Sequence, residues 1–326
     1  MTRLQALPQT GGILKTIVTL TVNPAIDKST ALDHVLAERK LYCKTPLHQP
    51  GGGGINVSRA VHRLGGESLA LYPAGGTVGQ RLRNLLDDEG INHQWTPIED
   101  TTRENLMVLE EATGQQYRFG MPGALMTESE WRYLLKELAD ITPKPDYIVA
   151  SGSLPPGVPN DFYVHAAGIA RDLGAKILVD TSGGALRTIL NAGGVYLLKP
   201  NMREIGELVG HQIKDDRDLE EVTAELVKGG HADVLAVSLG AGGALLVTKE
   251  GHHRLHAPPV PIKSKVGAGD SMVAGIVLSL ARGLPVLEAV RFGVAAGSAT
   301  VMSPGANLCS REDTERLYRQ MAAGKA

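Results

Sequence analysis

An aspartate beside closely spaced glycines, near the C-terminal end of the chain, has the composition of a turn that handles phosphate. Residues 266–271 are Val-Gly-Ala-Gly-Asp-Ser, and an apolar run of helical character follows at 272–280. Unpaired N–H groups at a helix start bind anions, and glycines leave those amides accessible to a phosphate. Asp270 can accept a proton from an attacking hydroxyl, with the transferred group bound by the amides of Gly267, Ala268 and Gly269. The alternative role for Asp270 is a simple helix cap.

A second glycine cluster lies near the N-terminal end, close to side chains suited to sugar hydroxyls. Residues 51–54 are four consecutive glycines, and Ile55 and Asn56 follow them. Asn56 and Asp27 supply an amide and a carboxylate that can bind hydroxyl groups. We expect a sugar to be enclosed by backbone amides of the run, those of Gly52, Gly53 and Gly54. Taken singly, the run also suits a flexible loop, and Asp27 a turn at a strand end.

The chain lacks the motifs of two common classes of phosphate-transfer protein. No G-x-x-x-x-G-K-[ST] segment is present, which excludes P-loop chemistry. No H-R-D or D-F-G set indicates a protein kinase. The predicted phosphate site must therefore have another design.

Composition excludes several further classes of protein. The chain has 326 residues, of which 43% are hydrophobic and 21% charged, as expected for one globular α/β domain. A net charge of −2 disfavours nucleic-acid binding, and the apolar stretch at 13–22 is too short to cross a membrane. The two isolated cysteines, Cys43 and Cys309, and the absence of a secretory leader favour a cytoplasmic location.

Short β-rich runs alternate with helical periodicity, which predicts a doubly wound, mostly parallel sheet with helices on both faces. The strands are expected at residues 13–22, 68–73, 147–151, 176–180, 195–199, 234–238 and 244–248. Helices are expected to include residues 56–64, 78–89, 128–141, 162–173, 202–209, 219–228 and 271–282. We expect residues 1–12 to be a loose N-terminal extension and residues 13–326 to form the α/β domain.

One region breaks this alternation and predicts a small separate β-sheet. Residues 105–111 and 115–121 are strand-like runs joined by Ala-Thr-Gly, which is typical of a β-hairpin. Together with the segment after Asp27, this hairpin is expected to form a β-lid inserted into the domain at about 28–47 and 101–121.

The two glycine clusters, taken together, resemble the two signatures of the ribokinase superfamily, and the resemblance extends from residue 13 to about residue 320. Within that superfamily, the segments most similar to the family B 6-phosphofructokinases are 20–27, 49–60, 151–157, 198–201 and 291–299. The resemblance implies transfer of the ATP γ-phosphoryl group, with Mg²⁺, to the C1 hydroxyl of fructose 6-phosphate, and Asp270 as the base. The related 1-phosphofructokinases and tagatose-6-phosphate kinases more usually carry a lysine inside the first glycine turn, where this chain has only glycine.

The same resemblance implies residues for the phosphorylated sugar. Arg103 and Arg118 are expected near its phosphate, which arginine suits through bidentate contact. Lys40, in the lid segment, is expected to add charge from the same or a neighbouring subunit. Ser153, at the carboxyl end of a predicted strand, is expected to bond a sugar hydroxyl. The chain departs from the family pattern at Tyr42, where the best-matched enzymes carry arginine. Without the resemblance, both arginines would be read as surface charges and Ser153 as a turn residue.

For the nucleotide and metal, the resemblance implies a further set of residues. Asn201 and Glu204 match the family's N-x-x-E pattern and are expected to hold Mg²⁺ largely through water; a helix-capping pair is the alternative. The nucleotide is expected near Lys199, Asn201, Ser238, Gly240, Gly243 and Lys265. K⁺ is implied at carbonyls around Ser264, Val266, Thr300, Ser303 and Gly305, although Ser303 and Asn307 depart from the closest pattern.

Alternative functions remain at this point. Tagatose-6-phosphate kinase and 1-phosphofructokinase are rivals within the fold, and a nucleoside kinase would leave Arg103 and Arg118 without an anion. A noncatalytic sugar-phosphate sensor is a rival from another class. We expect fructose 6-phosphate and ATP as ligands, no nucleic-acid or membrane partner, and a homodimer formed through strand edges of the β-lid.

Overall fold

The computed structural model describes residues 15–303, 305 and 307–324. The N-terminal extension expected at residues 1–12 lies outside this part of the chain. Within it, no helix is both long enough and apolar enough to cross a lipid bilayer.

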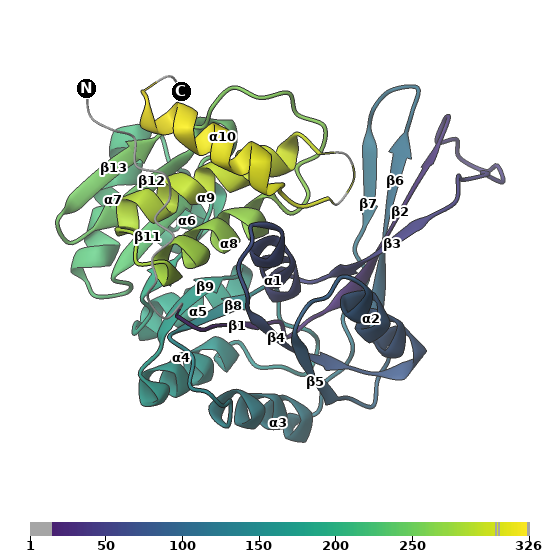
Figure 1. Cartoon of the computed structure of the whole chain (residues 1–326), viewed down its shortest axis with the longest axis horizontal. Helices are drawn as coiled ribbons and strands as arrows, with labels where there is room; N and C mark the ends of the chain where they lie inside the picture. The colour runs from purple at the N-terminus through teal and green to yellow at the C-terminus, as the bar shows by residue number, and fades with distance from the viewer. Residues whose placement is uncertain (1–14, 304, 306, 325–326) are drawn as a thin grey trace.

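A large sheet forms the centre of the molecule (Figure 1). In the described chain it has nine strands in the order β13-β12-β11-β10-β9-β8-β1-β4-β5. Their bounds are β13 Gly251–Leu255, β12 Ala244–Thr248, β11 Val234–Ser238, β10 Leu197–Leu198, β9 Lys176–Asp180, β8 Tyr147–Ser151, β1 Ile17–Leu20, β4 Leu69–Ala74 and β5 His93–Pro97. The pairs from β11 to β5 are parallel, whereas β12 and β13 are antiparallel additions at one edge. The predicted doubly wound fold is confirmed.

Strand order reverses beside β1, and this reversal decides where a ligand can bind. The chain proceeds from β1 to β4 and β5 on one side, then returns to β8 on the other side of β1. Ligands of open α/β sheets bind at the carboxyl ends of strands at such a switch point. The carboxyl ends of β1 and β8 are Leu20 and Ser151. A ligand-binding site is therefore expected beside these two strand ends.

Helices cover both faces of the large sheet. One face packs against α3 Glu128–Ala139, α4 Phe162–Leu173, α5 Gly183–Ala192, α6 Met202–Val209 and α7 Asp216–Lys228. The other packs against α1 Gly53–Arg63, α8 Ala268–Ala281, α9 Val286–Val301 and α10 Arg311–Ala322, with α2 Gly76–Asp88 over β4. The close packing of α8 on α9 requires Gly275, because a Cβ there would lie 2.9 Å from the Cα of Gly293.

The second sheet projects from the helical body at one side (Figure 1). Of the described residues, four strands form it in the order β3-β2-β6-β7, with bounds β3 Leu47–Gly51, β2 Ala25–Leu32, β6 Arg103–Glu110 and β7 Gln116–Phe119. We call it the lid sheet. The hairpin expected from the sequence is the antiparallel β6–β7 pair. The lid sheet is joined to the rest of the molecule through β2, which follows β1, and through β3, which leads into the first glycine turn and α1.

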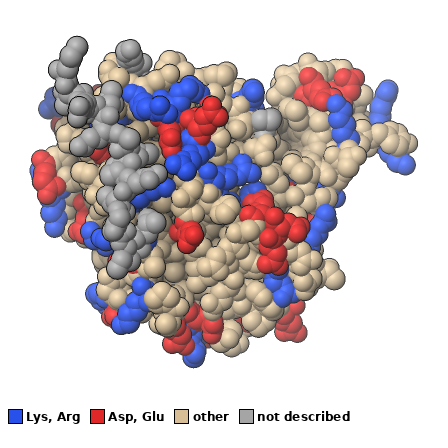
Figure 2. All heavy atoms as spheres, in the orientation of Figure 1, with Lys and Arg blue, Asp and Glu red and all other residues tan. Residues whose placement is uncertain are grey.

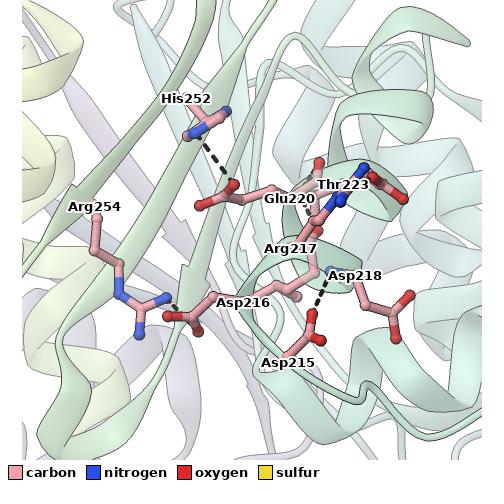
Figure 3. Close-up of polar contacts among 10 residues, drawn as sticks. Asp215, Asp216, Arg217, Asp218, Glu220, Thr223, His252 and Arg254 are labelled. Atoms are coloured by element: carbon pink, nitrogen blue, oxygen red, sulfur yellow. Dashed lines mark hydrogen bonds and ion pairs between the residues drawn. The ribbon is translucent and has the colours of Figure 1, made fainter.

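Charged side chains hold α7 against the edge strand β13 (Figure 3). Arg254 of β13 pairs with Asp216 at 3.0 Å, and His252 lies 3.4 Å from Glu220. Asp215 caps the start of α7 by accepting from the amide of Asp218 at 2.9 Å. These contacts attach the edge strand β13 to a helix on one face of the sheet.

Basic and acidic side chains lie interspersed on the face drawn in Figure 2, including the region of α10. In α10, Arg311 pairs with Glu315 at 2.7 Å and Arg316 with Asp313 at 2.6 Å. Such pairing leaves this face without one dominant sign of charge.

Candidate active site

The predicted base lies in the first turn of α8. Gly267 adopts a left-handed conformation with φ of 75° and is the N-cap, so that the helix begins at Ala268. A Cβ at Gly267 would lie 2.6 Å from Leu308, which adds a packing reason for glycine. Asp270 is therefore the third residue of α8, directly after the glycine-rich helix start.

The two glycine-rich turns meet at this carboxylate. Asn56, in the first turn of α1, donates from Nδ2 to Oδ2 of Asp270 at 3.0 Å. The residues are 214 positions apart in the chain. The structure thus brings the starts of α1 and α8 together at the switch point of the sheet.

Opposing charges around Asp270 set its affinity for protons. The pKa of Asp270 is raised from 3.8 to about 6, chiefly by burial and next by the carboxylate of Asp180. The Asn56 hydrogen bond and the Lys199 ammonium act in the opposite direction, and the charge of Asp27 adds to the increase. The result is a carboxylate that is ionised at neutral pH and still basic enough to accept a proton.

Lys199 is buried and pairs with Asp180, its Nζ 3.0 Å from Oδ1. Burial alone would lower the pKa of Lys199, but Asp180, Asp270 and Glu204 together raise it. A Cβ on Gly269 would lie 3.6 Å from Nζ, so this cation faces the turn that precedes the base. A fixed positive charge here is well placed for an anionic ligand.

Packing explains much of the first glycine run. A Cβ on Gly53 would lie 2.4 Å from Oγ of Ser151, and one on Gly54 2.6 Å from Oγ1 of Thr21. At Gly52, φ is 108°, a conformation that favours glycine. The run therefore lets α1 begin in contact with the ends of β1 and β8.

Asp27 lies under the end of the same turn, where a Cβ on Gly51 would be 2.4 Å from its Oδ2. Asn105 of β6 donates to Oδ1 of Asp27 at 2.8 Å. Asp27, Asn105 and Arg118 line a cavity of about 240 Å³, together with residues of β2, β6 and β7 and Val266 from the segment before α8. The lid sheet and the second glycine turn thus border one cavity.

Arg103 and Ser153 lie near each other at the base of the lid sheet, linked through Asn23. Arg103 donates to the carbonyls of Met121 at 2.9 Å and Asn23 at 3.1 Å, while its buried Nε has no hydrogen-bond partner. The side chain of Asn23 donates to Oγ of Ser153 at 3.1 Å. Both predicted residues are therefore fixed by polar contacts, and Arg103 keeps an unused donor.

Lys40 is not among the residues that line the 240 Å³ cavity. It lies in the exposed segment between β2 and β3, with Nζ 5.2 Å from the ring centroid of Tyr42. Tyr42 is 79% exposed. Within its own chain Lys40 thus lies apart from this cavity, and its contact with a sugar phosphate stays a prediction.

The residues predicted for the nucleotide and Mg²⁺ gather at the ends of β10 and β11. Asn201 and Glu204 form a capping box at the start of α6, with backbone-to-side-chain bonds of 2.8 and 2.9 Å, so the structural alternative is realised. Burial raises the pKa of Glu204. Asn201 also forms a backbone bridge with Ser238. No group of three or more His, Cys, Asp and Glu side chains in the described residues forms a metal site.

The turn after β11 needs glycine for its own geometry. Gly240 has φ of 58°, and Gly243 has φ of 91°, with a Cβ at Gly243 calculated only 1.9 Å from the carbonyl oxygen of Leu255. Lys265 is exposed, between this region and α8. Close packing against β13 therefore explains why residue 243 is glycine, which the sequence alone did not reveal.

The segments predicted for K⁺ run side by side. The amide of Ser264 donates to the carbonyl of Val301 at 3.3 Å, and the amide of Val266 to Oγ of Ser264 at 3.3 Å. The amide of Ser303 donates to the carbonyl of Thr300 at 2.9 Å, and Gly305 has φ of 68°. The segments containing residues 264–266 and 300–305 are therefore neighbours in the fold, next to the start of α8.

Sequence reasoning missed Asp180 and Asn105. Asp180 ends a parallel strand, and its position at that carboxyl end was the available signal. Asn105 faces Asp27 in the register of β2 with β6, which only the sheet pairing reveals.

This fold and site define a class of enzyme: an α/β kinase in which two glycine-rich helix starts meet beside one carboxylate. The pfkB family carbohydrate kinase model matches residues 17–313. The chain is 45% identical over 306 residues to the ATP-dependent 6-phosphofructokinase isozyme 2 of Mycobacterium tuberculosis, covering 94% of this chain and 90% of the relative. It is 43% identical to the same isozyme of Escherichia coli, covering 94% and 99%. The solved Escherichia coli phosphofructokinase-2 in complex with potassium superposes with a TM-score of 0.91 at 42% identity, covering 94% and 99%. The chain therefore belongs to the pfkB family of carbohydrate kinases.

Proposed function

We propose that this carbohydrate kinase is an ATP-dependent 6-phosphofructokinase, transferring the γ-phosphoryl group to the C1 hydroxyl of fructose 6-phosphate. The observation that carries the proposal is the meeting of Asn56 and Asp270 at 3.0 Å, beside a cavity lined by Asp27 and Arg118. A ketose phosphate bound there would meet a base, hydroxyl-binding groups and a cation.

In this mechanism, Asp270 accepts the proton of the C1 hydroxyl as that oxygen attacks phosphorus. The amides of Gly267, Ala268 and Gly269 stabilise the charge that develops on the transferred group, and the buried Lys199 adds a fixed positive charge. Asp27 with Asn105, the amides of Gly52, Gly53 and Gly54, and Ser153 orient the sugar hydroxyls. Arg103 and Arg118 hold its 6-phosphate.

We assign the nucleotide to Lys199, Asn201, Ser238, Gly240, Gly243 and Lys265. The buried carboxylate of Glu204 and the side-chain amide of Asn201 offer oxygen atoms that suit Mg²⁺, which keeps most of its water. When bound, Mg²⁺ would neutralise charge on the nucleotide phosphates. The adjoining backbone segments around Ser264, Val266, Thr300, Ser303 and Gly305 suit K⁺, and a solved Escherichia coli relative contains potassium.

The choice of fructose 6-phosphate is supported by relatives. The Escherichia coli enzyme has been solved in complex with fructose-6-phosphate, whereas a 1-phosphofructokinase of Borreliella burgdorferi is only 32% identical to this chain. The test is a panel of fructose 6-phosphate, tagatose 6-phosphate, fructose 1-phosphate and adenosine, each with ATP and Mg²⁺, with and without K⁺. The highest kcat/KM should be for fructose 6-phosphate. A higher value for another acceptor would reassign the substrate, and binding without ATP consumption would favour a noncatalytic sensor.

We further propose a cytoplasmic homodimer, joined through the lid sheet, whose edge strands β3 and β7 offer backbone groups for pairing. Lys40 would then act on the sugar phosphate of a neighbouring subunit, because it lies away from the cavity of its own chain. The solved tetrameric inhibited form of the Escherichia coli enzyme shows that larger assemblies occur among its relatives. Light scattering with and without ATP distinguishes a dimer from other states.

The pH dependence of kcat/KM should reveal the ionisation of Asp270. Because the pKa of Asp270 is raised to about 6, the base is protonated and inactive below that pH. We expect kcat/KM to fall about tenfold for each pH unit below 6 and to level off above 7. A profile flat from pH 5 to pH 8, in an enzyme that stays folded, would contradict this assignment.

Replacing Arg118 with methionine should weaken binding of the sugar phosphate specifically. A lost charge-assisted contact to phosphate corresponds to an increase of about 10- to 100-fold in the KM for fructose 6-phosphate. The KM for ATP should change little. Arg132→Met is the matched control, because Arg132 is an exposed arginine on α3 paired with Glu128 at 2.7 Å. Equal effects of both substitutions would remove Arg118 from the phosphate site.

A further inference from the structure

A buried arginine in α1 is hydrogen-bonded to the residue that contacts the base. Arg59 is 1% exposed. Its Nε and Nη2 donate to the two carboxylate oxygens of Glu89 at 2.7 and 2.6 Å. Its Nη1 donates to the carbonyl of Pro50 at 2.9 Å and to Oδ1 of Asn56 at 3.3 Å. A chain of polar contacts therefore runs from the end of α2 through Arg59 and Asn56 to Asp270.

This contact determines which way the Asn56 amide faces. A guanidinium only donates hydrogen bonds, so it selects the oxygen of the amide as its partner. The NH₂ group is then directed to Asp270, 3.0 Å away. In the flipped amide, Oδ1 would face the carboxylate of Asp270 and the NH₂ group would face the guanidinium, so both contacts would be repulsive. The contact with Pro50 also fixes the strand that enters the first glycine turn.

We propose that Arg59 is a positioning residue for phosphoryl transfer, which holds the Asn56 amide so that it donates to Asp270 and keeps that base ionised. This inference rests on the proposed role of Asp270. The other charged groups that face Asp270 are Asp180 from β9, Lys199 after β10 and Asp27 from β2. The two aspartates favour the protonated base and Lys199 the ionised one. The Asn56 hydrogen bond therefore shifts a balanced site towards the ionised, active form.

A purely structural role for Arg59 predicts a different result. Removing one partner of a buried ion pair is destabilising, because the other charge is left without a partner. If Arg59 only joined α1 to α2, its loss would lower the free energy of unfolding without moving the pH profile of activity. The acidic limb of kcat/KM against pH separates the two roles.

The experiment measures that limb with fructose 6-phosphate and ATP in Arg59→Met, in Arg59→Lys and in the control Arg63→Met. Arg63 is on the same helix and donates to the carbonyl of Leu308 at 3.3 Å, so its loss removes a charge of the same sign. Both Arg59 variants should move the limb upward by about one pH unit, with kcat/KM about fivefold lower at pH 6, about tenfold lower at pH 5, and recovering above pH 8. Arg63→Met should leave the limb in place. Arg59→Lys keeps the charge but has one donor group in place of three, so it also serves if the methionine variant does not fold.

A double-mutant cycle with Asn56→Ala tests whether Arg59 acts through that amide. In the Asn56→Ala background, replacing Arg59 should add less than about 0.3 pH units to the shift. An equal shift in both backgrounds, a wild-type limb in Arg59→Lys, or an equal shift in Arg63→Met would overturn the proposal. These outcomes are distinct from failure of the proposed function, which would appear as normal turnover in a variant lacking the Asp270 carboxylate.

Discussion

Replacing Asp270 with asparagine should lower kcat by roughly 10² to 10⁴ while both substrates still bind. Asparagine keeps the shape of the side chain and can still contact Asn56, but it cannot accept the proton of the attacking hydroxyl. The amides of 267–269 and Lys199 remain in place, so a residual rate is expected. Turnover is measured by coupled ADP release, and binding of fructose 6-phosphate and of a nonhydrolysable ATP analogue by calorimetry.

The stability of this variant provides its control. Since the pKa of Asp270 is raised in the folded protein, the folded state favours the protonated carboxyl, and ionisation lowers stability as pH rises from 3.8 through 6. An uncharged amide removes that cost, so Asp270→Asn should unfold at the same or a higher temperature than the wild type at pH 8. Loss of activity with retained stability would locate the effect in the chemistry, whereas near-normal turnover would exclude Asp270 as the base.

Replacing Gly54 with alanine should both destabilise the protein and inactivate it. The added Cβ would lie 2.6 Å from Oγ1 of Thr21, 2.7 Å from the carbonyl oxygen of Leu20 and 2.8 Å from its carbonyl carbon. Backbone atoms of a central strand cannot move aside cheaply, so we expect a loss in unfolding free energy of about 1–3 kcal/mol. The start of α1 must shift, and Asn56 two residues later moves with it. We therefore expect kcat/KM to fall by about 10²-fold, since small misplacements of catalytic groups are costly.

Gly168→Ala is the matched control for this substitution. Gly168 lies within α4 and not at the cavity, and a Cβ there would have only Nη2 of Arg171 within 4 Å, at an ordinary contact distance of 3.9 Å. Denaturant unfolding and steady-state kinetics of the two variants should therefore differ strongly. A Gly54→Ala enzyme with wild-type stability and activity would mean that the first glycine turn does not require close packing against β1.

The sheet was predictable because its central strands are buried on both faces and appear as continuous apolar runs. The runs at 147–151, 176–180, 234–238 and 244–248 coincide with β8, β9, β11 and β12. The edge strands β5 and β13 were missed because one side of each is exposed, which places polar residues such as His93 and His252 within them. Helix α9 was missed because most of its own residues are small or apolar and buried. It therefore lacks the polar face whose 3.6-residue spacing identifies an amphipathic helix.

The site was only partly predictable. The helix starts at Asn56 and Asp270 carry local glycine signals, so their meeting could be inferred from the sequence. Asp180 had only its place at the carboxyl end of a strand as a signal, and Arg59 had none, because its importance comes from Glu89, which is more than 15 residues away in the chain. Lys40 was expected near the sugar phosphate, but a contact with another subunit depends on an assembly that one sequence does not specify.

The first glycine run also has a structural meaning that its composition does not disclose. Glycines were expected for access of a sugar to backbone amides. The structure adds that side chains at Gly51, Gly53 and Gly54 would meet Asp27, Ser151 and Thr21 at 2.4–2.6 Å. Glycine at these positions thus allows close packing and also leaves the backbone amides accessible. Because both needs select glycine, the residue type alone could not show which of them applies.

The central claim is that this site delivers a phosphoryl group to the C1 hydroxyl of fructose 6-phosphate. The most direct test is phosphorus and carbon NMR of the product formed by purified enzyme from fructose 6-phosphate, ATP and Mg²⁺. We expect ADP and fructose 1,6-bisphosphate in equal amounts, with the new phosphorus coupled to carbon 1. A phosphoryl group on another carbon, or release of free phosphate without a sugar bisphosphate, would contradict the account.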